Sequence, residues 1–168
     1  QATISEGTQR LVITDNVPEG MRILSGNLVT RGSGITAAAP VITISADERS
    51  ITFDFGTVVN AGSTSPLDAS DRITLAVSTL VIDGPLQVAG RELTNNAQVV
   101  ISSPTQPGRP GGTVTDDASA TVDLVTSVLA LDKSASPAVV DAGDEVTYTL
   151  ILRHPGESTG PAYNVLVS

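Results

Sequence analysis

The sequence predicts an all-β protein of the sandwich type, and three observations carry this prediction. Short runs rich in Thr, Val and Ile alternate apolar with polar residues, as strands with one buried face do. No run of about ten residues carries the apolar stripe of a helix. Turn residues separate the runs at intervals compatible with a Greek key, which favours an immunoglobulin-like sandwich over a barrel.

The composition limits the core and the classes of partner. Aromatic residues make up only 2% of the 168 residues, so Val, Ile and Leu must supply most of the core. The net charge of −9 argues against nucleic acid, which rewards a basic surface. The chain has no Cys, and therefore neither a disulfide framework nor a thiolate metal site. No apolar run reaches the roughly 20 residues of a membrane-spanning helix, and no signal segment follows Gln1, so we expect a mature piece of a longer chain.

Residues 1–124 are expected to form one sandwich that lacks its first strand. Its strands are predicted at 11–14, 21–25, 41–44, 50–55, 71–82, 93–101 and 113–124. A polar turn joins 41–44 to 50–55 and predicts a hairpin there. Loops are predicted at 62–70 and at the Pro- and Gly-rich residues 103–112, and a loop or weak strand at 27–39.

Residues 125–168 are expected to be the N-terminal part of the next repeat. The first strand is predicted at 129–133 and a third at 163–167, after a turn at 154–157. Between them, residues 145–152 place Val146, Tyr148, Leu150 and Leu152 on one face, as in a half-buried strand. These residues are too few to close a core of their own.

The stretch 128–168 carries an ordered set of short motifs. They are Leu129, Leu131, Lys133-Ser134, Ser136-Pro137, Gly143-Asp144, Val146-Thr147-Tyr148-Thr149 and Ala162-Tyr163-Asn164-Val165. In this order they resemble the conserved-repeat domain of bacterial surface proteins (domain of unknown function 11) and the related isopeptide-forming fimbrial domains. His154 departs from the pattern, because the family usually has Asn in this turn. The resemblance implies an immunoglobulin-like repeat of an extracellular or cell-surface bacterial protein.

A looser resemblance to the same family extends over residues 11–101. Asp15-x-Val17-Pro18-x-Gly20 is similar to the Asp-x-Leu-Pro-x-Gly segment of the family. The run that begins at Leu11 also matches the run that begins at Val165, at an offset of 154 residues. This spacing suits tandem surface domains.

The resemblance also implies a candidate crosslink. In the isopeptide-forming relatives, a lysine on the first strand condenses with an asparagine on the last strand, helped by a buried carboxyl group. Lys133, the only lysine in the chain, matches the first position, and Asn95 in Leu-Thr-Asn-Asn-Ala matches the second. Asp54, between two Phe residues, is the candidate carboxyl. Because Lys133 and Asn95 fall in different repeats, the alternative is that Lys133 is a solvated strand lysine and Asn95 an ordinary polar residue.

The remaining polar residues predict no catalytic site and no cofactor. Acidic residues recur near the expected junction, at Asp116, Asp117, Asp123, Asp132, Asp141 and Asp144. Calcium could be held by such carboxylates, and the alternative is that they keep the chain soluble and its strand edges unpaired. His154 lies in a predicted turn without the partners of a catalytic triad. We therefore expect a protein that is not an enzyme.

These observations predict a structural repeat of a bacterial cell-surface or secreted fibre or adhesin, which extends a stalk or filament. Its partners would be neighbouring repeats or subunits of the same protein. One alternative is a self-assembling filament subunit, joined by β-strand addition between neighbours. Another is a ligand-binding surface module that uses the 27–39 and 103–112 loops.

Overall fold

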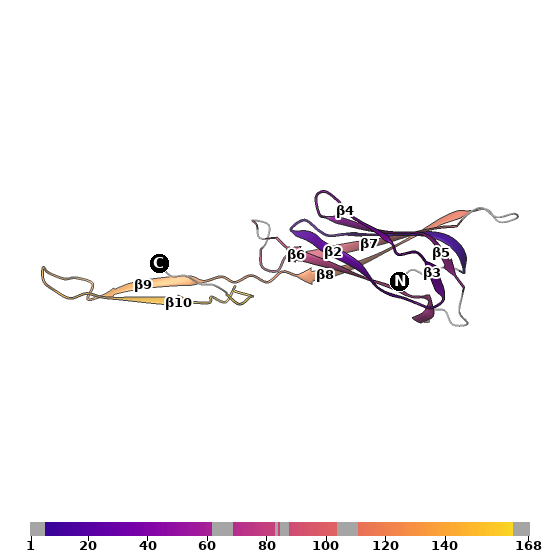
Figure 1. Cartoon of the computed structure of the whole chain (residues 1–168). Helices are drawn as coiled ribbons and strands as arrows, with labels where there is room; N and C mark the ends of the chain where they lie inside the picture. Colours follow the sequence, from indigo (N-terminus) through magenta and orange to yellow (C-terminus); the bar gives the residue numbers. More distant parts are fainter. Residues whose placement is uncertain (1–5, 62–68, 83, 85–87, 104–110, 163–168) are drawn as a thin grey trace. The chain divides into compact units, whose positions relative to one another are not determined.

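The computed structural model describes residues 6–61, 69–82, 84, 88–103 and 111–162. The chain divides into two compact units (Figure 1). The first comprises Gln1–Gly84 with Leu93–Val122, and the second comprises Pro85–Glu92 with Asp123–Ser168. The described residues form β-strands and one short 3-10 turn at Ala69–Asp71, with no α-helix among them, so the all-β prediction is confirmed.

The larger sheet of the first unit has six strands. They are β1 (Gly7–Asn16), β3 (Ile35–Ala37), β4 (Val41–Ile44), β5 (Ser50–Asn60), β7 (Glu92–Ser103) and β8 (Gly112–Asp123). Their order is β3-β5-β1-β7-β8, and β4 also pairs with β5. β1 lies in the middle, antiparallel to both β5 and β7. The predicted hairpin is confirmed as β4 and β5, which pair antiparallel.

A second, two-stranded sheet packs on the first to give a sandwich. It consists of β2 (Met21–Arg31) and β6 (Ile73–Val81), which are antiparallel. The core between the sheets is Leu11, Val17, Ile23, Ile35, Ile51, Phe53, Phe55, Val58 and Ile101. The sheets are in close contact at Gly26 of β2, where an added Cβ would clash with the Ile51 side chain.

A β-bulge keeps both halves of β5 directed into this core. The register with β1 shifts between Leu11 and Val12, which pair with Gly56 and Asp54 and leave Phe55 as the extra residue. Gly56 adopts a φ of 61° there, a left-handed conformation that Gly tolerates best. The inward positions therefore change from odd-numbered residues, such as Phe53, to even-numbered ones, such as Val58.

β8 forms one end of the larger sheet and leaves apolar side chains exposed. Three side-chain bonds join its odd-numbered residues to β7: Thr94 with Thr121 (2.9 Å), Gln98 with Asp117 (3.0 Å) and Ser102 with Thr113 (3.3 Å). The residue numbers rise along β7 as they fall along β8, so the two strands are antiparallel. The β7 residues that alternate with them include the buried Leu93 and Ile101. Val114 and Val122 therefore lie on the core-bearing face, where they are 64% and 55% exposed.

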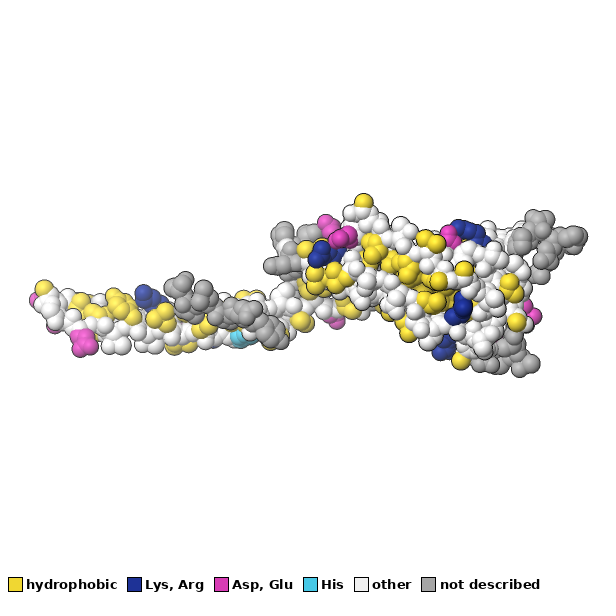
Figure 2. Space-filling model, viewed as in Figure 1, with side chains coloured by type: hydrophobic (Ala, Val, Ile, Leu, Met, Phe, Trp, Pro, Cys, Tyr) yellow, Lys and Arg dark blue, Asp and Glu magenta, His cyan; other side chains and the backbone are white. Residues whose placement is uncertain are grey.

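The second unit contains one described hairpin, β9 (Ala130–Ser136) with β10 (Thr147–Arg153). Leu131, Leu150, Leu152 and Tyr148 share one face of it, which confirms the predicted alternation. The expected half-burial is not found, because these four side chains are 43–60% exposed. Figure 2 shows apolar side chains on the surface of this hairpin.

The segment between β8 and β9 is held by hydrogen bonds within the second unit. Leu124 bonds through its N–H and its carbonyl to Arg91 and Gly90. The carbonyl of Thr126 accepts bonds from the N–H groups of Thr159 and Gly160. Leu124 and Thr126 therefore have backbone partners, while residues 124–129 form no strand.

The other element predictions differ from the structure mainly in length. Most predicted strands are found with longer bounds. The 27–39 segment, predicted as a loop or weak strand, contains the end of β2 and all of β3. The third strand predicted at 163–167 and most of the 62–70 and 103–112 loops lie outside the described residues.

Candidate functional site

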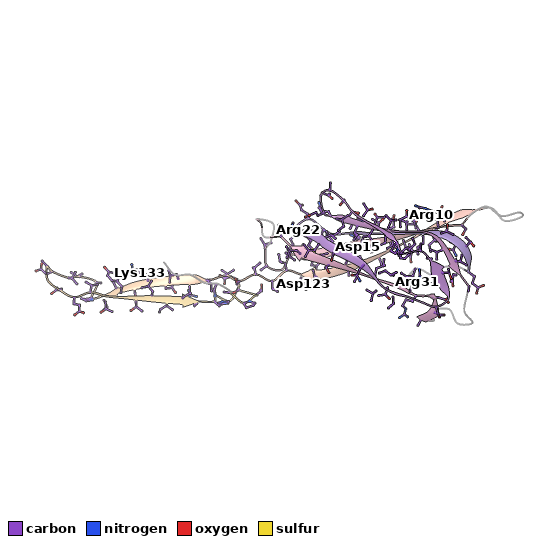
Figure 3. All side chains as sticks on the ribbon, viewed as in Figure 1. Arg10, Asp15, Arg22, Arg31, Asp123 and Lys133 are labelled. Carbon is purple, nitrogen blue, oxygen red and sulfur yellow. The ribbon has the colours of Figure 1, made fainter. Side chains whose placement is uncertain are left out.

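Asp15 places a carboxyl group inside the sandwich. It follows Leu11 and Ile13 on the inward face of β1 and lies opposite Ile51 of β5 and Ala97 of β7. Only 7% of Asp15 is exposed. Figure 3 labels Asp15 on the larger sheet of the first unit.

Asn95 of β7 is the partner of this buried carboxyl. Its Nδ2 donates a 2.8 Å hydrogen bond to Asp15 Oδ1. Asn95 Oδ1 is also buried, and it has no hydrogen-bond partner in the part of the chain that the structure describes. Burial raises the pKa of Asp15, and the bond from Asn95 only partly opposes that rise. The pair thus combines a carboxyl that favours its protonated form with a carboxamide whose oxygen can still accept a bond.

Asp54, the candidate carboxyl from the sequence, lies elsewhere. Arg10 Nη2 donates to its Oδ2 at 2.6 Å, and the backbone N–H of Gly56 donates to its Oδ1 at 2.8 Å. Arg10 and Asp54 each alternate with buried residues, so this ion pair lies on the outward face of the larger sheet. The carboxyl group beside Asn95 is therefore Asp15, which the sequence had marked only as part of an Asp-x-Val-Pro turn motif.

Lys133 lies in the second unit, whereas Asn95 and Asp54 lie in the first. On β9 it is opposite Leu150 and shares the apolar face of the hairpin with Leu131 and Tyr148. Its ammonium group is 4.8 Å from the centre of the Tyr148 ring, a cation–π contact on an exposed surface.

The other residues singled out in the sequence mostly have local partners. His154 Nδ1 is 3.0 Å from Ser158 Oγ, within the turn. Asp132 forms a 2.9 Å ion pair with Arg153, and Asp144 accepts a bond from the N–H of Asp141. Among the described residues, no three His, Cys, Asp or Glu side chains gather in a way that could hold a metal ion. No helix in those same residues is long and apolar enough to cross a membrane.

Comparison with known proteins adds no assignment to this geometry. Neither a scan against protein-family models nor a search of curated proteins gives a match to the chain. The Asp15–Asn95 pair is therefore interpreted from its own chemistry. It offers a partly buried carboxamide beside a buried carboxyl group that can donate or accept a proton.

Proposed function

We propose that the chain is a load-bearing structural unit of a bacterial cell-surface or secreted fibre, and that neighbouring repeats of the same protein are its partners. The observation that carries this proposal is the direction of the strands at which the chain enters and leaves the larger sheet. β1 is antiparallel to β7, and the side-chain bonds of β7 with β8 also run in opposite directions. β1 and β8 are therefore parallel to each other and are separated by β7.

This arrangement loads the sheet in shear when the chain is pulled. The chain enters β1 at Gly7 and leaves β8 at Asp123, which lie at opposite ends of the ladder. Ladder hydrogen bonds are perpendicular to the strands, so tension along the strands acts on many of them together. Pulling two paired strand ends apart would instead break the bonds one pair at a time. A stalk under tension benefits from the first geometry.

Single-molecule pulling through two pairs of handles tests the proposal. The chain has no Cys, so handles can be attached through pairs of cysteine substitutions at exposed positions. Thr8→Cys with Asp123→Cys loads the sheet in shear. Thr8→Cys with Val59→Cys unzips the β1–β5 ladder, because Thr8 and Val59 are directly paired. We expect a several-fold higher rupture force for the first pair.

A second function, covalent joining of copies, is favoured by the contact between Asp15 and Asn95. In this proposal the Nζ of Lys133 from one copy attacks the carboxamide carbon of Asn95 in another. A new C–N bond forms, the bond from that carbon to Nδ2 breaks, and ammonia leaves. Asp15 shuttles the proton from the amine to the departing nitrogen, which its raised pKa suits. No oxidant or cofactor is needed.

The intact mass of the denatured protein tests this joining. Each crosslink should lower the mass by one ammonia and produce covalent oligomers on a denaturing gel. Lys133→Arg, Asn95→Ala and Asp15→Ala should each abolish both signals. Asp54→Ala is the matched control and should retain them, because Asp54 bonds Arg10 on the other face of the sheet. An unmodified monomer mass for the natural chain would contradict the proposal.

A further inference from the structure

The larger sheet ends in a long strand whose outer edge has no partner strand among the described residues. β8 is the last strand in the order β3-β5-β1-β7-β8, and no further strand pairs with it among the described residues. It is 12 residues long and contains neither Pro nor Lys, two devices that commonly block pairing at an edge, and its charged residues are Asp116, Asp117 and Asp123. Such an edge presents a row of backbone N–H and C=O groups that another strand can pair with.

Two of the five pairs of positions that flank Ala118 within β8 carry identical residues. Thr115 and Thr121 lie three residues to either side of Ala118, and Val114 and Val122 lie four residues to either side. A strand that pairs antiparallel with its own copy about this axis places the residues of each matched pair opposite each other. This symmetry indicates which partner the edge fits.

We propose that β8 is a two-fold pairing edge, at which a second copy of this chain extends the sheet through its own β8. The axis passes at Ala118. Each Val114 then lies opposite Val122 of the second copy, and each Thr115 opposite Thr121. The interface is self-complementary, as a two-fold interface must be. It joins copies side by side, so it goes beyond the proposed stalk and does not depend on it.

Burial and charge favour the same register. Val114 and Val122 are 64% and 55% exposed in the single chain, and the pairing would bring them into contact on the core-bearing face. In this register Asp116 faces Ala120 of the second copy and Asp117 faces Ser119, so no acid faces an acid. Moving the axis to Asp117 would place two Asp117 side chains opposite each other, a like-charge pair that destabilises a ladder.

Two lysine substitutions with opposite expected effects test the register. Ala118→Lys places two ammonium groups opposite each other at the axis, whereas Ala120→Lys places each ammonium opposite Asp116 of the second copy. Both positions are exposed and on the same face of β8, and both substitutions change the net charge equally. Sedimentation equilibrium at about 0.15 M salt, where distant charges are screened, measures the dimer Kd. We expect Ala118→Lys to have a Kd about tenfold or more above that of Ala120→Lys.

Disulfide formation gives an independent measurement. Opposite residues in an antiparallel pair have Cβ atoms about 4.5–5.5 Å apart, close to disulfide range. Ala118→Cys should therefore form a covalent dimer on mild oxidation. Ala120→Cys is the control, because it and its copy would be offset by four residues, roughly 13 Å along the strands. Equal Kd values for the two lysine variants, or equal crosslinking of the two cysteine variants, would overturn the proposal, as would a natural chain that stays monomeric at about 1 mM.

Discussion

At the scale of single residues, Asp15 is the least expected feature of the molecule. A carboxyl group is rarely buried in a core without a strong partner, because desolvation disfavours its charged form. Here the partner is the Asn95 amide, at 2.8 Å. The sequence supplied Asn95 through its resemblance to a known strand motif. It could not supply Asp15, because the pairing of β1 with β7 brings together residues that are 80 positions apart.

We predict that Asp15→Asn stabilises the first unit at neutral pH by about 1 kcal/mol. Burial raises the pKa of Asp15 above its unfolded value. Its ionisation therefore costs folding stability, and this cost is absent below the unfolded pKa and complete above the folded pKa. The advantage of the variant should shrink as the pH falls through the raised pKa. Urea unfolding of both chains across the acidic range measures it, and a variant less stable than the natural chain at pH 7 would contradict this account.

The Arg10–Asp54 ion pair provides the contrasting case. Both side chains are partly exposed, and pairs of this kind contribute little. We predict that Arg10→Ala changes the free energy of unfolding by less than about 1 kcal/mol. Urea unfolding at low and high salt measures it. A larger loss would show that the outward face of the sheet contributes more to stability than its exposure implies.

At the scale of elements, strand positions followed from alternation, whereas the close contacts between sheets did not. The 50–55 run was predicted as a strand, but the bulge that carries β5 on to Asn60 depends on one unpaired residue, Phe55. Likewise, the strand predicted at 21–25 stops one residue before Gly26, and residues 27–39 were predicted as a loop or weak strand. In the structure Gly26 lies in β2 against Ile51 and Phe53. A tertiary contact decides its role, and periodicity does not report such contacts.

We predict that Gly26→Ala destabilises the first unit by about 1–3 kcal/mol. The added Cβ would clash with Ile51 Cδ1 and with Phe53 Cζ, so these buried side chains or the strands that carry them must shift. Gly112→Ala in β8 is the matched control, because its Cβ would meet nothing within 4 Å. Thermal or urea unfolding measures both. Equal effects would show that the sheets do not pack closely at Gly26.

At the scale of the whole molecule, the two units differ in how much they bury. The first has a core between two sheets, whereas the described hairpin of the second leaves its apolar face exposed. The sequence indicated that residues 125–168 are too few to close a core. It could not indicate which face of the hairpin would carry Lys133, because that depends on the register of β9 with β10.

We predict a large difference in hydrogen-exchange protection between the units. A two-stranded hairpin is marginally stable in water. Amides of β9 and β10 should therefore exchange no more than about tenfold more slowly than unprotected amides. Amides in the middle of β1 and β5 should exchange only through global unfolding, because both strands are paired on two sides. Exchange followed by mass spectrometry measures both. Equal protection would mean that a partner covers the hairpin.

Rupture force measured through the two handle pairs tests the central claim most directly, since a load-bearing unit must resist tension along its own chain. If the chain is such a unit, pulling between positions 8 and 123 should give one high-force event that releases the sandwich as a whole, well above the force needed between positions 8 and 59. Equal forces for the two pairs, or a lower force between 8 and 123, would contradict the claim that this fold is arranged to carry load.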